Sequence, residues 1–312
     1  NTLRDFRLSG VSLEEEKKKQ FMANASSLSE LTSRFSDNVL DATQSWGKHI
    51  TDSSELDGLP ETALAGAADK AREKELDGWY LTLDFPAYYA VMCHCRNRAL
   101  REEMYVAHTT RASEQGPDAG KYDNSAIMQD ILRLRHDQAQ LLGFNHYGDK
   151  SLATKMARDV EQVMGFLMDL AKRSKDQAQQ ELDALRDFAA EQGADQLEPW
   201  DIAFWSERLR EARYDISEEE LRPWFPAEKV IGGMFAIVEK LFGIRIRQRD
   251  GVDVWHDEVR FYDVEDEAGE HMASFYLDMY ARTGKRGGAW MDDCQGRVRL
   301  IDGELQKPVA YL

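Results

Sequence analysis

Residues 160–188, VEQVMGFLMDLAKRSKDQAQQELDALRDF, decide the fold class of this chain. Apolar side chains recur there at intervals of three and four residues, so they fall on one face of an α-helix. That face consists of Val160, Val163, Met164, Leu167, Leu170, Ala171, Ala178, Leu182, Leu185 and Phe188. Asp159 and Gly193 flank the stretch and are residue types that start and stop helices. We therefore expect a helix of about thirty residues and a mainly helical protein around it.

A second long helix is predicted from Leu13 to about Trp46. Ser12 and Glu15 have the spacing of a capping box. At 1.5 Å per residue the helix would be about 50 Å long, which exceeds what a compact globule needs. Its apolar stripe consists of Leu28, Leu31, Phe35, Val39, Ala42 and Trp46.

Shorter helices complete the predicted helical region. They are expected over residues 60–76, 86–111 with a break near Asn97, 124–142 with Asn124 as the cap, 199–214 and 227–242.

The hydrophobic period changes after Gly243. Ile244 and Ile246 alternate with arginines, which is typical of a strand. Residues 259–264 and 271–277 are predicted to form a hairpin, and residues 298–301 and 309–312 a second one around the Asp302-Gly303 turn. We therefore expect a helical region over residues 1–243, followed by a small antiparallel sheet over residues 244–312.

Composition restricts the possible partners. The formal net charge is −17, which argues against nucleic acid or an anionic membrane surface as a partner. No apolar run has the length of a membrane span, and residues 1–10 do not resemble a signal peptide. Three cysteines are too few for a disulfide framework, so we expect reduced thiols and a cytoplasmic protein.

Familiar catalytic patterns do not occur in this sequence. Among the seven histidines no pair has the i, i+4 spacing of a metallopeptidase helix. Cys93-His94-Cys95 invites a metal interpretation, but residues two apart on a helix point in different directions. A phosphate-binding P-loop at Lys285 is excluded because Arg286 stands where Ser or Thr is required.

Two segments leave alternatives open. Gly284, Gly287 and Gly288 either permit a turn or let another backbone approach closely. Arg245, Arg247 and Arg249 form a basic strand face, which is either a charged edge strand or a carboxylate-binding stripe.

Three segments together resemble the thimet oligopeptidase family of zinc peptidases. They are LEPWDIAFWSERLREARYDISEEELRPWFPAEKVIGGMFAIVEKLFGI (197–244), SFYLDMYARTGKRGGAWMDD (274–293) and KPVAYL (307–312). The resemblance implies a two-lobed, largely helical enzyme whose channel admits short unfolded peptides. In that family a His-Glu-x-x-His helix and a later Glu hold zinc, which activates water for hydrolysis.

None of these zinc-binding or catalytic residues is present in residues 1–312. The resemblance therefore implies an internal piece of such an enzyme, without catalytic or metal-ligating residues of its own, and inactive by itself. Zinc would be held by the complete enzyme, and the remaining part of the enzyme would be a partner. Such a piece would expose apolar surface on its last strands. The alternative function is a non-catalytic helical module that binds peptides or proteins.

One functional role is carried over from related zinc peptidases, in which a strand ahead of the zinc helix pairs with the extended substrate. The matching segment is Gly287, Gly288, Ala289 and Trp290. Because three of these residues have little or no side chain, a peptide backbone can approach them closely. We therefore predict that these four residues bind the substrate.

Overall fold

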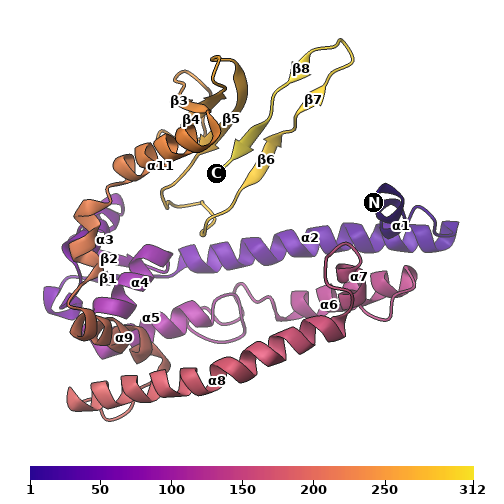
Figure 1. Cartoon of the computed structure of the whole chain (residues 1–312). Coiled ribbons are helices and arrows are strands. Elements are labelled where there is room, and N and C mark those ends of the chain that lie inside the picture. The colour runs from indigo at the N-terminus through magenta and orange to yellow at the C-terminus, as the bar shows by residue number, and fades with distance from the viewer. The chain divides into compact units, whose positions relative to one another are not determined.

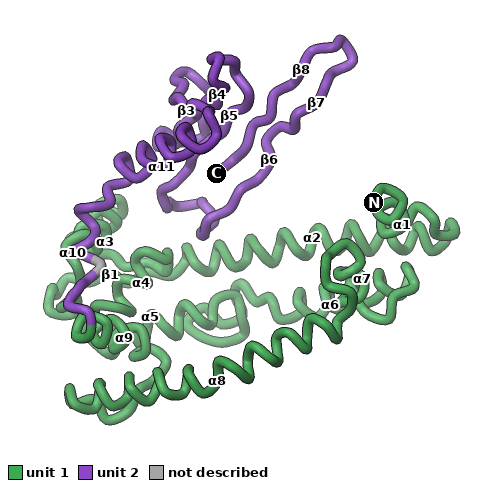
Figure 2. Tube along the Cα trace, viewed as in Figure 1, with its two compact units in different colours: residues 1–213 green, residues 214–312 purple. Residues whose placement is uncertain are grey.

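The computed structural model describes the backbone of residues 1–312 and every side chain except that of Glu218. The chain divides into two compact units, Asn1–Arg213 and Tyr214–Leu312 (Figure 2). The boundary predicted near residue 243 falls inside the second unit, between its long helix and its first strand. As a domain boundary, it stays a prediction.

The first unit is built from helices and one short strand pair. Its elements are α1 (Thr2–Leu8), α2 (Glu15–Ser45), β1 (Gly47–Ile50), η1 (Ser53–Leu56), α3 (Glu61–Glu73), β2 (Trp79–Thr82), α4 (Phe85–His94), α5 (Arg98–Thr109), α6 (Ser125–Leu141), α7 (Tyr147–Leu152), α8 (Val160–Glu191) and α9 (Pro199–Tyr214), whose last residue belongs to the second unit. The two long helices, α2 and α8, are the ones that the sequence predicts (Figure 1).

The core of the first unit gathers where α3, α4 and α5 pack on the β1–β2 pair. β1 and β2 are antiparallel, with Ile50 opposite Trp79. Fully buried apolar side chains from several elements meet in this core: Ile50, Leu56, Leu81, Leu83, Val91, Leu100 and Met104. Four-residue strands carry too little period to be predicted, because only their burial against the helices distinguishes them from turns.

Helix starts follow the predicted positions, and Asn124 is the N-cap residue of α6 as predicted, but the capping box predicted before α2 is wrong. The N-cap of α2 is Glu14, which makes no capping hydrogen bond with its side chain, so Ser12 and Glu15 form no capping box. Asn124 precedes α6, yet its side chain donates to the carbonyl of Phe35 and accepts from Asn38 Nδ2 at 2.8 Å. Asn124 is buried, and its side-chain hydrogen bonds join α6 to α2.

The predicted apolar face of α8 is only partly buried. Leu185 and Ala189 are buried near its C-terminal end. Met164, Leu167 and Leu170 are about half exposed, at 50%, 51% and 47%. Periodicity predicts which side chains share a face, but it does not say whether another element covers that face.

The second unit packs one long helix with a five-stranded sheet. Its elements after α9 are α10 (Glu218–Leu221), η2 (Arg222–Trp224), α11 (Ala227–Phe242), β3 (Arg245–Gln248), β4 (Arg260–Glu265), β5 (His271–Leu277), β6 (Asp292–Gln295), β7 (Val298–Arg299), β8 (Leu305–Gln306) and β9 (Val309–Tyr311). The sheet order is β3-β4-β5-β9-β6, and β7 pairs separately with β8 (Figure 1).

The β4–β5 hairpin is confirmed, whereas the last predicted hairpin is wrong in its pairing. The Asp302-Gly303 turn joins β7 to β8. β9 instead enters the five-stranded sheet, parallel to β5 and antiparallel to β6. Turn chemistry predicts the local reversal, but the neighbour of a short strand depends on long-range pairing.

The predicted fold class is confirmed: the protein is mainly α-helical, with small sheets near the C-terminal end. None of the helices in the described part of the chain is long and apolar enough to cross a membrane.

Candidate functional site

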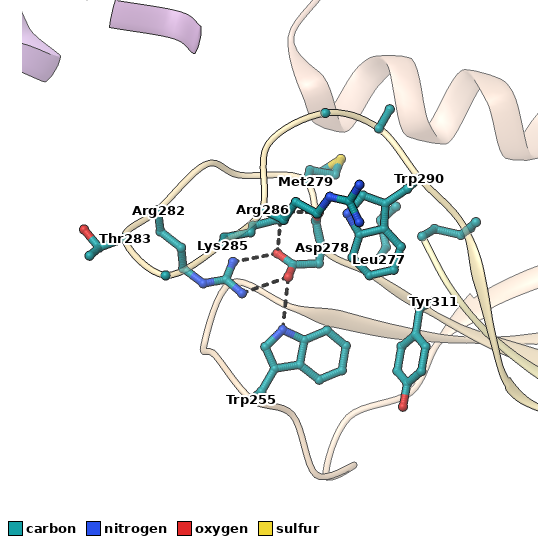
Figure 3. A pocket seen from close by; sticks show the side chains of 14 residues that line it. Trp255, Leu277, Asp278, Met279, Arg282, Thr283, Lys285, Arg286, Trp290 and Tyr311 are labelled. Atoms are coloured by element: carbon teal, nitrogen blue, oxygen red, sulfur yellow. Dashed lines mark hydrogen bonds and ion pairs between the residues drawn. The ribbon is translucent and has the colours of Figure 1, made fainter. Parts of the chain in front are cut away.

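A pocket of about 870 Å³ opens in the second unit beside the C-terminal end of β5 (Figure 3). Its wall comes from three places: Trp255 in the β3–β4 connection, the loop between β5 and β6, and the end of β9. The lining residues are Trp255, Leu277, Asp278, Met279, Arg282, Thr283, Gly284, Lys285, Arg286, Gly288, Ala289, Trp290, Tyr311 and Leu312.

The carboxylate of Asp278 organises the loop that forms most of this wall. Arg282 donates to both carboxylate oxygens, at 2.7 and 2.8 Å. Lys285 Nζ donates at 3.0 Å and the indole Nε1 of Trp255 also at 3.0 Å, as the dashed lines of Figure 3 show. One partly buried carboxylate therefore joins residues that are up to thirty positions apart in the sequence.

Hydrogen bonds to backbone carbonyls also hold this loop, and one of them joins it to the sheet. Lys285 Nζ donates to the carbonyls of Asp278 and Tyr280, at 2.6 and 2.9 Å. The amide of Asp278 donates to the carbonyl of Leu312 at 2.9 Å, at the end of β9. The loop is therefore held by its own cations on one side and by the sheet on the other.

Electrostatics keep Asp278 ionised. The hydrogen bonds from Arg282 lower the pKa of Asp278 most; burial opposes them, and the bonds from Lys285 and Trp255 lower it further. A carboxylate that accepts several charge-assisted hydrogen bonds is a weak proton acceptor. Asp278 therefore has a structural role at neutral pH and is poorly suited to act as a general base.

Aromatic side chains form the apolar part of the wall. Trp255 packs against Tyr276 and Tyr311, with ring centroids 5.1 and 5.6 Å apart. Trp290 and Met279 are exposed by 50% and 38%, respectively, and both line the pocket. Apolar walls with a few placed polar groups are typical of ligand sites.

The predicted substrate-binding segment lies at this pocket. Gly288, Ala289 and Trp290 line it, and Gly287 precedes them in the same loop. The four residues form no strand, and the chain enters β6 only at Asp292. Their role in binding substrate stays a prediction.

The glycines of this loop adopt turn conformations. Gly284 and Gly288 have φ values of 81° and 95°, the left-handed region that glycine tolerates best. A Cβ atom added at Gly284, Gly287 or Gly288 would meet nothing within 4 Å. The turn interpretation is therefore supported at Gly284 and Gly288. The open space around Gly287 leaves room for an approaching ligand backbone.

The basic strand β3 is the charged edge strand of the five-stranded sheet. Its two arginines, and Arg249 just after the strand, already have carboxylate partners: Arg245 contacts Glu239, Arg247 contacts Glu265 and Arg249 contacts Asp263. This favours edge protection over a free carboxylate-binding stripe.

The cysteines and histidines form no cluster that would suit a metal. Cys93 and Cys95 are buried, and burial raises the pKa of the Cys95 thiol. Across the described side chains no group of three or more His, Cys, Asp or Glu could hold a metal ion. The described residues therefore do not fit a zinc site.

Sequence reasoning missed Asp278, Trp255 and Arg286 as members of the site. The charged residues Asp278, Arg282 and Lys285 have a spacing of four and three directly after a predicted strand, which is a signal of a loop closed on one carboxylate. Trp255 gives no such signal, because only the fold brings the β3–β4 connection beside the end of β5.

Comparisons with known proteins show the family of this chain. The model of "Peptidase family M3" matches residues 91–312. The chain is 57% identical to oligopeptidase A of Escherichia coli (strain K12), over 100% of this chain and 46% of that protein. It is 45% identical to the organellar oligopeptidase A of Arabidopsis thaliana, over 98% of this chain and 40% of that protein.

A more distant relative belongs to the same group. The dipeptidyl carboxypeptidase of E. coli (strain K12) is 35% identical over 92% of this chain and 42% of that protein. The chain thus spans less than half the length of each of these relatives. The family match covers more than half of the chain, and the chain belongs to peptidase family M3.

Proposed function

We propose that this chain supplies the peptide-binding part of a zinc-dependent endopeptidase that hydrolyses short unfolded peptides in the cytosol. One observation carries the proposal: in a chain of peptidase family M3, Gly288, Ala289 and Trp290 line an open, largely apolar pocket. In the whole enzyme a zinc ion would polarise the scissile carbonyl and activate water. Residues outside this sequence would hold the ion, so the chain alone is expected to be inactive.

The loop before β6 offers a peptide both backbone and side-chain contacts. β6 lies at the edge of the five-stranded sheet, and its residues Asp292–Gln295 are exposed. An edge strand presents unpaired N–H and C=O groups to which an extended peptide can add. The proposed substrate would run along residues 287–290 and place one side chain in the pocket.

The remaining part of the enzyme is the proposed partner of the exposed apolar faces. Leu167 of α8 is 51% exposed, and Ile237 and Leu241 of α11 are 61% and 67% exposed. Ile301 in the β7–β8 turn is fully exposed. Large apolar surfaces of this kind mark interfaces. Relatives more than twice as long as this chain have the additional length to cover them.

The test compares two glycine variants in a family-length protein that carries this sequence. Gly288→Val places a branched residue at a φ of 95°, so a loss of activity there combines backbone strain with any steric block. Gly287→Val avoids this problem, because Gly287 has no positive φ and its added Cβ meets nothing within 4 Å. We expect Gly287→Val to lower kcat/KM for a short peptide at least about tenfold, since the peptide backbone loses its close approach.

Gly296→Val is the matched control, since Gly296 also has open surroundings, no positive φ and a position outside the pocket lining. Unchanged kinetics in Gly287→Val would contradict the proposed role of the segment. Elemental analysis of the 312-residue chain should give near-zero zinc, whereas the longer protein should hold the metal. If the longer protein bound peptides without cleaving them, the non-catalytic binding module would be the correct function.

A further inference from the structure

The charges around the pocket are unbalanced. Its lining holds one carboxylate, Asp278, and three cations, Arg282, Lys285 and Arg286. The excess of two positive charges is unexpected in a chain whose formal net charge is −17. A locally basic pocket in an acidic protein attracts anionic groups while the rest of the surface repels them.

Two of the three cations already form ion pairs with Asp278. Arg282 and Lys285 both contact Asp278, and their side chains are only 19% and 15% exposed. Their hydrogen bonds close the loop, so a ligand would gain little from displacing them. Their charges cancel that of Asp278 and leave a net positive charge of one besides Arg286.

Arg286 is the cation that remains available. Its side chain is exposed, and no acceptor or carboxylate of the described residues lies within hydrogen-bond or ion-pair distance of it. Figure 3 draws Arg286 beside the loop with no dashed line to it, in contrast to Arg282 and Lys285. A guanidinium group presents several N–H donors in a planar fork that matches a carboxylate.

Apolar surface lies in the same pocket. Trp290 and Trp255 are 50% and 52% exposed, and Met279 is 38% exposed. Large aromatic surfaces left in water are stabilised when an apolar side chain covers them. The pocket thus combines an unpaired guanidinium with two half-exposed indoles.

We propose that this pocket is a specificity subsite for a peptide segment that carries a carboxylate next to a large apolar side chain. The carboxylate binds Arg286 and the apolar side chain packs against Trp255 and Trp290. The carboxylate is either the C-terminal one or that of an Asp or Glu side chain, since both have the same chemistry. This inference rests on the proposed function, because it assumes that residues 287–290 bind peptides.

The test measures binding of four short peptides to the 312-residue chain by titration calorimetry. The first ends in Phe with a free carboxylate, and the second is its C-terminal amide. The third is the amide with Glu before Phe, and the fourth has Gln in place of that Glu. We expect the first or the third peptide to bind about threefold to tenfold more tightly than its neutral counterpart. Which of the two gains affinity identifies the source of the carboxylate.

Arg286→Gln should remove this preference, so that the charged peptides bind no more tightly than their neutral counterparts. Arg286→Lys should restore part of it, because the charge returns without the planar fork. Arg297→Gln is the matched control, since Arg297 is also exposed in the second unit but does not line the pocket. Replacing Phe by Ala in the peptide should weaken binding to the wild type more than to Trp290→Ala.

The outcomes separate this inference from the proposed function. Equal affinity for charged and neutral peptides, with Gly287→Val still abolishing binding, overturns the carboxylate subsite and leaves peptide binding intact. A preference that persists in Arg286→Gln also overturns it. If none of the four peptides binds, both the subsite and the proposed peptide-binding role of this chain are wrong.

Discussion

Two aspartates, one in each unit, are each held by two cations, yet they have different surroundings. Asp201 of α9 pairs with Arg98 and Arg101 of α5, each at 2.7 Å. Asp278 pairs with Arg282 and Lys285 within its own loop. The side chains of Asp201 and Arg101 are 2% and 3% exposed, whereas Asp278 lines an open pocket.

The two aspartates differ in the elements that their hydrogen bonds join. Arg101 also donates to the carbonyls of Cys95 and Trp200, so the Asp201 cluster joins α9 to the turn between α4 and α5. Burial raises the pKa of Asp201, but the hydrogen bonds, those from Arg98 foremost, outweigh it and lower the pKa overall. The Asp278 cluster joins no helices; it shapes the β5–β6 loop and links this loop to Trp255 of the β3–β4 connection. The same pairing therefore joins helices in one place and shapes a pocket wall in the other.

The largest effect is expected from Asp201→Ala. Removing this carboxylate leaves the guanidinium of Arg101 buried without its partner, which typically costs about 3–5 kcal/mol of unfolding free energy. Urea denaturation monitored by circular dichroism measures it. The double variant Asp201→Leu/Arg101→Met should recover much of the loss, since it leaves no unpaired charge. A loss in Asp201→Ala no larger than that of Asp278→Asn, measured in the same way, would show that the two clusters are energetically alike.

A smaller and local effect is expected from Asp278→Asn. The amide keeps the shape but loses the charge-assisted bonds to Arg282 and Lys285, at a cost of about 1–3 kcal/mol. Amide hydrogen exchange should speed up in residues 279–290 and stay unchanged in the first unit. Asp257→Asn is the control, because Asp257 is exposed and lies outside the pocket lining. Protection lost equally in both units would contradict a local role.

The difference in stability between the wild type and Asp278→Asn has a defined pH dependence. Because the pKa of Asp278 is held below its ordinary value of 3.8, its contribution is complete above that pH. It is lost only as the pH falls through the lowered value. The difference in stability between the wild type and Asp278→Asn should therefore be constant from pH 7 to pH 5.

The smallest effect is expected at His108, a half-buried imidazole without an ion-pair partner among the described residues. His108 stacks on Tyr88, with centroids 3.9 Å apart, and burial with the nearby Arg111 lowers its pKa from 6.5 to about 4. Between these values the unfolded chain binds more protons than the folded one, so stability should fall as the pH drops from about 6.5 to 4. His108→Phe keeps the stacking and should flatten this part of the urea-midpoint profile. An unchanged profile would mean that the burial of His108 does not contribute to the pH dependence of stability.

Much of the helical architecture could be predicted from the sequence, but the site could be predicted only in part. The predicted bounds of α9 and α11 match the observed ones, because amphipathic period and flanking Pro or Gly residues are local signals. Gly288, Ala289 and Trp290 were singled out and do line the pocket. Asp278 was not, because one of its three donors, Trp255, comes from a distant segment whose approach no local pattern encodes.

The sequence by itself determined the helices, the β4–β5 hairpin and the family resemblance, since each depends on residues close together in the chain or on ordered motifs. The tertiary structure decided the parallel pairing of β9 with β5, the exposure of the apolar face of α8 and the convergence of Trp255 on Asp278. These features depend on contacts between distant segments. Such contacts are set by which surfaces pack together to exclude water, and a single stretch of sequence does not contain that information.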